Sequence, residues 1–444
     1  MASTQLTRTA TSGTNTKATF SAWVKKADAN EQFLFYHFGS SANNFRIRFD
    51  PDTIGVQTLS SSSSVMHLNT SAKFRDPSAW YHIVVAIDST QATDTNRAKI
   101  YVNGVQQTSL SATTYPPQNQ NMHFNESATV YIGGQAGSNY FNGSMTHLHW
   151  IDGTAYDAST FGETDSTSGI WKPKTAPSVT YGTNGFYLKF ENSAAMGTDS
   201  SGNSNNFTVS GTLTQNVDTP SNNFATMNPL DNFYANGTFA NGNNTVTSVS
   251  GDATYNTSTL GVSSGKWYWE CKWSAQPTGS TNQVLIGITK RPTTNANFFL
   301  GMKAWTYAYM AASGAVLQSD STIITYNTYS IGDIIGVALD LDNNRLYFSK
   351  NGVFQNSSNP ANGTNPISIT APDSTAEDSG AYFAGFGDGN SNLQETGQFN
   401  FGNGYFGTTA VASANADGNG HGKMEYSVPS GFYTLNTKNL KEFG

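Results

Sequence analysis

Apolar and polar residues alternate with a period of two along much of the chain, in short segments separated by turns rich in Gly, Asn and Ser. This period is typical of a half-buried β-strand, because successive side chains of a strand point to opposite faces of the sheet. No long segment with the 3.6-residue period of a helix interrupts the series. The pattern therefore predicts an all-β protein.

One arrangement of strands occurs twice. The first copy is WYHIVVAID at Trp80–Asp88 followed by RAKIYVNGV at Arg97–Val105, and the second is Tyr329–Asn344 followed by RLYFSKNGV at Arg345–Val353. Each copy ends in an Asn-Gly pair, which is the strongest short-range signal for a hairpin because both turn residues must accept a positive φ. The repetition predicts two tandem antiparallel β-sandwiches of one general kind.

Two strands show where the cores lie. Trp80–Asp88 is apolar on both faces, which predicts a central strand covered on both sides. Gly265–Trp273 alternates so that one face forms an apolar core wall. The residues of that wall are Trp267, Trp269, Cys271 and Trp273. We therefore expect Cys271 to be a buried, inert thiol.

Breaks in the strand rhythm divide the chain. We expect a first sandwich over residues 1–217 and a linker over 218–232, where two prolines and several turn formers occur together. A second sandwich is expected over 233–407. The glycine- and alanine-rich remainder, 408–444, is expected to be an extended C-terminal tail that packs on its own domain or on a neighbour.

The charge pattern excludes several classes of partner. Charged residues make up only 12% of the chain and the net charge is −7, with Lys25–Lys26 and Lys290–Pro292 as the densest basic spots. These spots are too small to follow a phosphate backbone, so no nucleic-acid partner is expected. No apolar stretch is long enough to span a membrane, and we identify no signal peptide. The single cysteine allows no intrachain disulfide, which indicates synthesis in a reducing cytosol.

Catalytic constellations are missing from the sequence. A glycosidase of a sandwich fold needs carboxylates paired across the scissile bond, but Glu191 and Glu270 stand alone. Glu163 and Asp165 are two residues apart in a segment that reads as a surface loop. The glycine-rich segment Gly133–Gly143 lacks the lysine and helix of a phosphate-binding loop. We therefore predict a protein that is not an enzyme and has no catalytic residues.

Two histidines have the spacing of metal ligands. His147 and His149 are placed by the period of two on one face of a strand, but no third ligand accompanies them. Exposed or hydrogen-bonded histidines of a strand are the simpler explanation of the pair, so no metal site is assigned and no cofactor is predicted.

Aromatic residues in predicted loops are the candidates for ligand binding. Such side chains stack on sugar rings or anchor on another subunit, although each of them can also pack beneath its own loop. The candidates are Tyr115, Tyr140, Phe141, Phe298 and Phe299.

Several phrases resemble known families. WYHIVVAID, KIYVNGV, YIGG and FNGSMTHLHWIDG resemble the laminin-G/pentraxin group of concanavalin A-like jelly rolls. GKWYWECKW, IGITK and GDIIGVALDLDNNRLYFSKNGV resemble SPRY domains. The resemblance implies a laminin-G-like sandwich followed by a SPRY-like one. It also leaves open a calcium ion on the rim of the first sandwich, where Asp88, Asp94 and Asn96 lie in a suitable loop, without assigning its ligands.

The combination of these phrases with FRDPSAW, FGETD, YGTNGFYLKF, DSSGNSNNFT, DTPSNNF and PSGFYTLNTKNL resembles large virion proteins of tailed phages, of the tail-fibre or decoration type. The resemblance implies a structural protein on the virion surface, made in the host cytoplasm and released by lysis. It further implies a homo-oligomer that contacts other virion proteins and host-surface glycans without membrane insertion. Two alternatives stay open: a polysaccharide depolymerase, and a capsid or tail cement protein with no host ligand.

Overall fold

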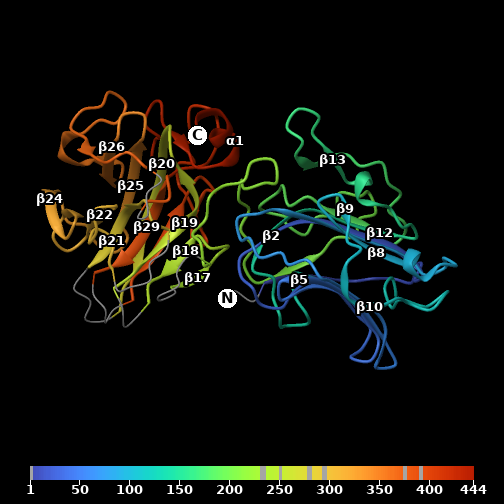
Figure 1. Ribbon diagram of the computed structural model, residues 1–444. Coiled ribbons are helices and arrows are strands. Elements are labelled where there is room, and N and C mark those ends of the chain that lie inside the picture. The colour runs from blue at the N-terminus through green and yellow to red at the C-terminus, as the bar shows by residue number, and fades with distance from the viewer. Residues whose placement is uncertain are drawn as a thin grey trace. The chain divides into compact units, whose positions relative to one another are not determined.

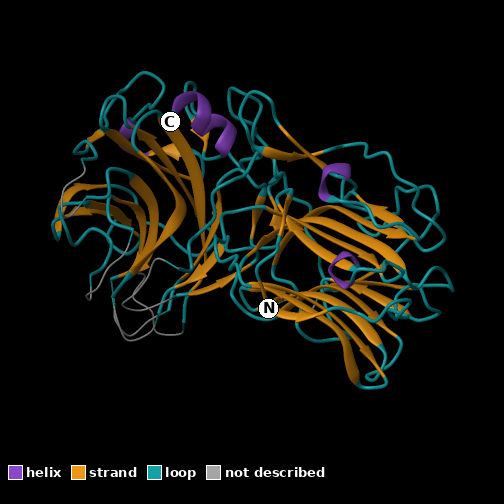
Figure 2. Cartoon of the chain, turned by 45° about the vertical axis from the view of Figure 1, so that its right-hand side comes forward, coloured by secondary structure: helices purple, strands orange, loops and turns teal. Residues whose placement is uncertain are grey.

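The computed structural model describes residues 4–230, 237–249, 253–277, 283–292, 298–373, 378–389 and 394–444. The chain forms two compact units, Met1–Gln215 and Asn216–Gly444 (Figure 1). Strands dominate both units, as Figure 2 shows, which confirms the predicted all-β class. None of the described helices is long and apolar enough to cross a membrane.

The first unit is a sandwich of two antiparallel sheets. In hydrogen-bonding order, the large sheet consists of β10 (Leu110–Thr114), β6 (Ser63–Thr70), β5 (Thr53–Ser60), β4 (Asn44–Asp50), β3 (Gln32–Phe38), β11 (Thr129–Ile132), β1 (Gln5–Thr9) and β16 (Thr208–Ser210). The small sheet consists of β15 (Phe186–Leu188), β12 (Gly143–Asp152), β2 (Lys17–Lys26), β7 (Tyr81–Asp88), β8 (Ala98–Val102) and β9 (Val105–Gln106).

The first core lies between these sheets. Phe20 of β2 and Val85 of β7 meet Phe45 and Ile47 of β4, and all four side chains are buried. Burial of each such side chain contributes about 1.5–3 kcal/mol. Every residue of β7 is buried, and β7 pairs with β2 and β8 on its two sides. The prediction of a central strand is thereby confirmed.

A second layer covers the outer face of the small sheet. We call residues 153–184 the covering segment; it contains the hairpin of β13 (Gly162–Thr164) and β14 (Trp171–Pro173). Its Phe161 packs in one apolar cluster with Val84 of β7 and Ile151 of β12. This layer explains why β7 is apolar on both faces.

The second unit is also a sandwich. Its tryptophan sheet consists, within the described ranges, of β17 (Thr238–Ala240), β18 (Thr245–Thr247), β30 (Thr396–Asn400), β20 (Lys266–Ala275), β25 (Ile334–Asp340), β26 (Arg345–Lys350) and β27 (Val353–Phe354), with β28 (Ile367–Ser368) beside β26 and β33 (Tyr433–Thr434) beside β20. The opposite sheet consists of β19 (Tyr255–Val262), β29 (Tyr382–Asp388), β21 (Val284–Thr289), β22 (Thr306–Met310), β23 (Ala315–Gln318) and β24 (Ser321–Thr325). A small hairpin of β31 (Tyr405–Phe406) and β32 (Thr409–Ala410) follows β30.

The predicted wall of β20 forms the centre of the second core. The four side chains of that wall, Trp267, Trp269, Cys271 and Trp273, are buried in one cluster with residues of the opposite sheet. The indole Nε1 of Trp273 donates a hydrogen bond to Glu395 Oε2 at 2.9 Å. Burial raises the pKa of the Cys271 thiol well above its usual value, as expected of an inert cysteine.

The C-terminal segment completes the tryptophan sheet. The strand β33 lies parallel to β20, with Tyr433 opposite Trp267, and α1 (Thr437–Phe443) follows it. Met424 and Phe432 bury Tyr268 on the outer face of β20. Residues of the expected linker also pack in this unit, since Ala225 and Met227 belong to its core. Residues 218–230 and 408–444 are therefore structural parts of the second unit.

Both Asn-Gly pairs form the predicted hairpins. Asn103 and Gly104 have φ of 48° and 83°, and Asn351 and Gly352 have φ of 49° and 80°. These two pairs join β8 to β9 and β26 to β27, where positive φ at both turn residues matches the twist of the strands.

Candidate functional site

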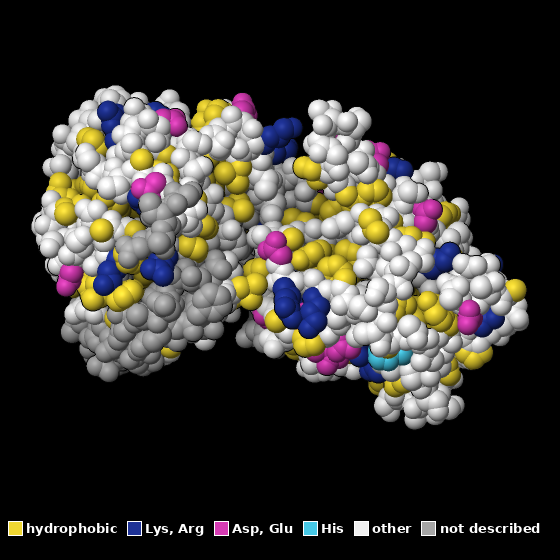
Figure 3. All heavy atoms as spheres, in the orientation of Figure 1, with side chains coloured by type: hydrophobic (Ala, Val, Ile, Leu, Met, Phe, Trp, Pro, Cys, Tyr) yellow, Lys and Arg dark blue, Asp and Glu magenta, His cyan; other side chains and the backbone are white. Residues whose placement is uncertain are grey.

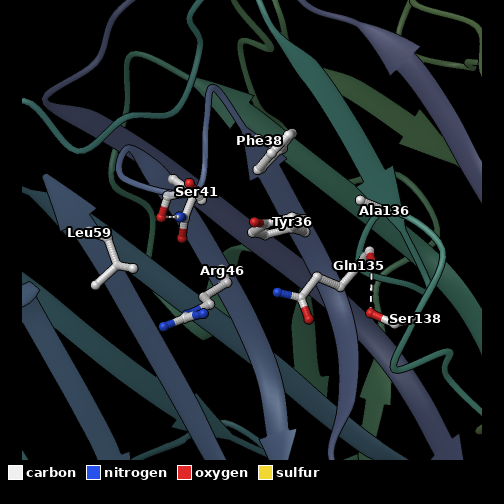
Figure 4. A pocket seen from close by; sticks show the side chains of 9 residues that line it. Tyr36, Phe38, Ser41, Arg46, Leu59, Gln135, Ala136 and Ser138 are labelled. Atoms are coloured by element: carbon white, nitrogen blue, oxygen red, sulfur yellow. Dashed lines mark hydrogen bonds between the residues drawn. The ribbon is translucent and has the colours of Figure 1, made fainter. Parts of the chain in front are cut away.

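A shallow hollow lies on the outer face of the large sheet in the first unit. Its volume is about 360 Å³. Figure 4 shows side chains of β3 and β4 on its floor, between Leu59 of β5 on one side and Ser138 on the other. The lining residues are Tyr36, Phe38, Ser41, Asn44, Arg46, Leu59, Gln135, Ala136 and Ser138.

The strand alternation brings these residues to one face. In β4, Phe45, Ile47 and Phe49 enter the core, so Asn44 and Arg46 face outward. In β3, a register irregularity between Phe33 and Phe35 changes the alternation. The hollow therefore receives its floor from strands whose other faces build the core.

Aromatic rings cluster around Tyr36, and two of them, Tyr36 and Phe38, line the hollow. The ring centroid of Tyr36 lies 5.5 Å from that of Phe33, 5.6 Å from that of Phe38 and 6.0 Å from that of Tyr131. Aromatic faces of this kind offer stacking surfaces for flat apolar faces of a ligand. Tyr36 is only 3% exposed, and Phe38 is half-buried, so Phe38 is the more accessible ring.

The arginines of β4 differ in their partners. Arg46 donates from Nε and Nη2 to Gln57 Oε1, at 3.0 and 2.5 Å. Arg48 also donates to Gln57, but it forms ion pairs with Glu31 at 3.1 Å and Asp50 at 3.0 Å. Arg48 is therefore neutralised by carboxylates, whereas the hydrogen-bond partner of Arg46 is a neutral amide.

Polar groups complete the walls. Burial raises the pKa of Tyr36 above its usual value, and a side-chain hydrogen bond with Gln135 opposes this effect. Asn44 is 2% exposed and donates from Nδ2 to the carbonyl oxygens of Ser40 and Ser41, both at 3.2 Å. Its Oδ1 accepts no hydrogen bond within the described part of the chain. The hollow thus combines rings, amides, hydroxyls and one guanidinium, which is the usual composition of a small polar binding site.

The predicted loop Gly133–Gly143 forms one wall of the hollow, but with different residues from those expected. Gln135, Ala136 and Ser138 line it. Phe141 instead stacks on the core residue Phe49, with ring centroids 6.4 Å apart, and Tyr140 is half-buried against the same loop, near Gly134 and Gly137. Ligand binding by Tyr140 and Phe141 stays a prediction.

The other predicted aromatic residues lie elsewhere. Tyr115 is half-buried against the first core, away from the residues that line the hollow. In the second unit, Phe299 packs beside Tyr255 and Leu285. Phe298 stacks beneath Lys303, whose Nζ lies 4.0 Å from its ring centroid, a favourable cation–π contact. Binding at these positions also stays a prediction.

The two histidines of β12 are engaged by tyrosines. A register irregularity separates Thr146 from His149, and His147 has a φ of 47°, so the simple i, i+2 spacing is lost. His147 Nδ1 pairs with Tyr187 Oη at 2.7 Å, and His149 Nδ1 pairs with Tyr181 Oη at 2.9 Å. Burial lowers the pKa of both imidazoles, that of His149 well below its usual value. In the described ranges, no three His, Cys, Asp or Glu side chains gather as a metal site.

A serine–histidine contact on the same face lacks the geometry of a nucleophile and its base. His82 Nε2 lies 2.9 Å from Ser21 Oγ, and Trp171 Nε1 lies 3.0 Å from His82 Nδ1. An indole can only donate, so Nδ1 accepts and the proton of the neutral ring is on Nε2. His82 therefore donates to Ser21 and does not activate it. Burial lowers the pKa of His82 to about 3.

The rim loop considered for calcium does not fit the ion. The carboxylate of Asp88 accepts hydrogen bonds from Thr90 N at 3.1 Å and Gln91 Nε2 at 2.7 Å, and it pairs with Lys17 at 3.3 Å. Asp94 accepts from the amide N–H of Thr95 at 2.7 Å. Donors therefore occupy both carboxylate oxygens of Asp88 and Oδ1 of Asp94, and we assign no cation to this loop.

The carboxylates considered for glycoside hydrolysis have structural partners. Glu163 and Asp165 share Lys172, whose Nζ lies 3.6 and 2.9 Å from them, on the exposed hairpin of β13 and β14. Glu270 is fully buried beneath the C-terminal segment and accepts from the amide N–H groups of Glu425 and Tyr426 at 2.9 and 2.8 Å. These contacts account for all three acidic groups without a substrate.

Sequence reasoning missed Arg46, Tyr36 and Gln57 as site residues. The available signal was the alternation in NFRIRFD, where arginines interrupt a core strand and must therefore face outward. Nothing in the sequence alone places Gln57 beside Arg46, because this contact depends on the register of β4 with β5.

Comparisons with known proteins agree with the two folds. Residues 2–159 match the family model of the concanavalin A-like lectin/glucanases superfamily, and residues 266–365 match that of the SPRY domain. The chain therefore carries a concanavalin A-like domain followed by a SPRY domain, as the sequence predicted. Both are binding and protein-interaction folds, typically without catalysis, which indicates a binding role. No curated protein matches the chain in sequence.

Several solved structures are similar to parts of the chain. The SPRY domain of human HERC1 is 21% identical, with coverage of 39% of this chain and 96% of its own and a TM-score of 0.31. Stonustoxin is 17% identical, with coverage of 40% and 27% and a TM-score of 0.28. A heptameric SAP-like pentraxin from Limulus polyphemus is 16% identical, with coverage of 34% and 71% and a TM-score of 0.27.

Proposed function

We propose that the protein is a non-enzymatic saccharide-binding protein, and that the hollow of the first domain is its binding site. The observation that carries the proposal is the meeting of aromatic rings, amides, hydroxyls and one guanidinium on an open sheet face. An open floor suits one or a few sugar units of a longer chain, because the polymer can continue past both ends.

The finer proposal places the protein on the surface of a tailed-phage virion, where it binds host-surface glycans. The resemblance of its sequence phrases supports this setting. An uncharged polar surface is compatible with it: on the face drawn in Figure 3, charged side chains lie singly or in small groups among uncharged atoms. Several copies on one particle, as a homo-oligomer and in contact with other virion proteins, would turn weak single-site binding into avidity.

The test combines binding and hydrolysis in one experiment. Purified protein is mixed with envelope polysaccharide of the host, and co-sedimentation and new reducing ends are followed together. We expect retention without new reducing ends. New reducing ends would instead support the depolymerase, and the absence of both signals would favour the cement protein.

A blocking variant locates the site. Ser138 is exposed on the wall of the hollow, so Ser138→Trp fills the hollow without altering the core. The matched control is Ser166→Trp, at an exposed position of the β13–β14 turn. We expect Ser138→Trp to abolish retention and Ser166→Trp to leave it unchanged. Equal retention by both variants would contradict the assignment of the hollow.

A further inference from the structure

We propose that the hollow selects an acidic saccharide, a uronic-acid unit whose carboxylate binds Arg46. This inference rests on the proposed function of the hollow and specifies the chemical class of the sugar. Of the nine lining residues, Arg46 alone is charged.

The guanidinium of Arg46 keeps hydrogen-bonding capacity for an anion. A guanidinium has five N–H donors, and the hydrogen bonds to Gln57 use Nε–H and one N–H of Nη2. The other edge of the guanidinium, Nη1 with the second N–H of Nη2, has no acceptor within the described part of the chain. This edge has the geometry that accepts a carboxylate through two parallel hydrogen bonds.

Within the described part of the chain, Arg46 forms no direct ion pair, and Glu31 and Asp50 act on it only from a longer distance. Its ionised neighbour Arg48 is paired with Glu31 and Asp50, whereas the ion pairs found among the described residues do not include Arg46. Burial lowers the pKa of Arg46 and Arg48 acts in the same direction, and together they outweigh the opposite effect of the more distant Glu31 and Asp50. A partly buried cation without a carboxylate partner is stabilised by a bound anion, because such charges are costly to desolvate unpaired.

The neighbours of Arg46 suit a sugar ring more than a free inorganic anion. Phe38 supplies an accessible ring on the adjacent strand, and Figure 4 shows Tyr36 between Arg46 and the loop of Gln135. Ser41 and Ser138 add hydroxyl groups on the two sides.

Long-range attraction does not account for such selectivity. The chain has a net charge of −7, so its overall field repels a polyanion. Recognition must therefore come from short-range contact with Arg46. One ion pair also predicts a weak dependence of affinity on salt, unlike the steep dependence of a polybasic surface.

The experiment compares each polymer with its neutral form. Binding of the full chain to alginate and to hyaluronan is measured by calorimetry, together with the same polymers after reduction of their carboxylates to primary alcohols. We expect wild-type protein to bind at least one acidic polymer about tenfold or more tightly than its reduced form, the effect of losing one charge-assisted contact. Inorganic phosphate is added as a competitor, and competition at low millimolar concentration would assign the anion to phosphate instead.

Variants assign the effect to Arg46. Arg46→Gln is expected to remove the tenfold preference while binding of the reduced polymer is unchanged, and Arg46→Lys is expected to restore part of it. The control is Arg75→Gln, which removes the same charge from an exposed ion pair with Asp52 outside the hollow. Thermal unfolding of each variant checks that the first unit remains folded.

The outcomes separate this inference from the proposed function. Equal affinity of wild-type protein for acidic and reduced polymers, or no affinity for either acidic polymer, overturns the acidic preference. If wild-type protein nevertheless retains host polysaccharide and Ser138→Trp does not, the proposal of a saccharide site in the hollow still stands. If Ser138→Trp retains the polysaccharide as well as wild type does, both the acidic preference and the saccharide site in the hollow are overturned.

Discussion

Glu270 is a buried carboxyl group on the outer face of β20. It accepts hydrogen bonds from Glu425 N, Tyr426 N, Tyr268 Oη and Asn400 Nδ2, at 2.8–3.3 Å. Burial raises its pKa to about 7, and these four donors limit the rise because they favour the ionised form. The protonation state of Glu270 therefore affects the contact between the C-terminal segment and β20.

The raised pKa predicts a pH-dependent stability of the second unit. The carboxyl group of Glu270 binds its proton more tightly in the folded protein than in the unfolded chain, where its pKa is 4.5. Its protonation therefore adds to the free energy of unfolding below pH 4.5, and this stabilisation is lost as the pH rises to about 7. The loss is on the order of 3 kcal/mol. Thermal unfolding between pH 4.5 and 8 would measure it.

The matched variant is Glu270→Gln, which cannot ionise. The variant loses part of the hydrogen bonding at every pH, because its amide presents one oxygen to several donors. Its free energy of unfolding lacks the pH dependence that the carboxyl group causes. The stability difference between wild type and variant should therefore change across this pH range. A constant difference would contradict the assignment.

At the scale of elements, both Asn-Gly hairpins lie against an aromatic ring of a segment that covers their sheet. A Cβ at Gly104 would lie 2.8 Å from the ring of Trp171, and a Cβ at Gly352 would lie 2.5 Å from the ring of Tyr426. Glycine is thus required at these turns by its positive φ and by close approach of a neighbour. The two domains share this arrangement although their covering segments differ in sequence.

Gly332 permits the two effects at Gly352 to be separated. Both glycines have positive φ, 93° and 80°, but a Cβ at Gly332 would meet no atom within 4 Å. We expect Gly332→Ala to cost about 1–2 kcal/mol for the left-handed backbone alone. Gly352→Ala should cost about 1–3 kcal/mol more because the ring of Tyr426 must move. Urea denaturation would measure both, and equal costs would show that the ring yields freely.

At the scale of the whole molecule, each unit has its own core. The C-terminal segment belongs to the second: Leu435 packs in its main cluster, while Met424 and Phe432 cover Tyr268. Asp417 connects parts of the C-terminal segment to one another. Its Oδ2 accepts hydrogen bonds from Thr434 N at 3.0 Å and from Asn439 Nδ2 at 2.7 Å. Such a segment is integral to the fold and differs from an independent tail.

Deletion of residues 408–444 should therefore affect one unit selectively. It uncovers Tyr268 and Glu270 and removes β33, so we expect loss of the cooperative unfolding transition of the second unit. The transition of the first unit should persist, because its core contains none of the deleted residues. Differential scanning calorimetry distinguishes the two, and an unchanged second transition would contradict this role of the segment.

The sequence by itself determined the local and periodic features of this protein. Period-two alternation defined the strands, the Asn-Gly pairs defined hairpins, and the tryptophans of β20 identified a core wall, because these properties depend on neighbours in the chain. The two domain types followed from the sequence segments that resemble the laminin-G and SPRY families. The apolar outer face of β7 also indicated that a further layer must cover it.

Only the tertiary structure decided which distant residues meet. Arg46 and Gln57 face each other through the register of β4 with β5, and the loop at Gln135 reaches them from beyond β11. In that loop Phe141 is half-buried and stacks on Phe49 of the core, a contact that burial of apolar surface favours. Strand pairing and burial are set by the whole chain, and a binding hollow on a sheet face arises from both.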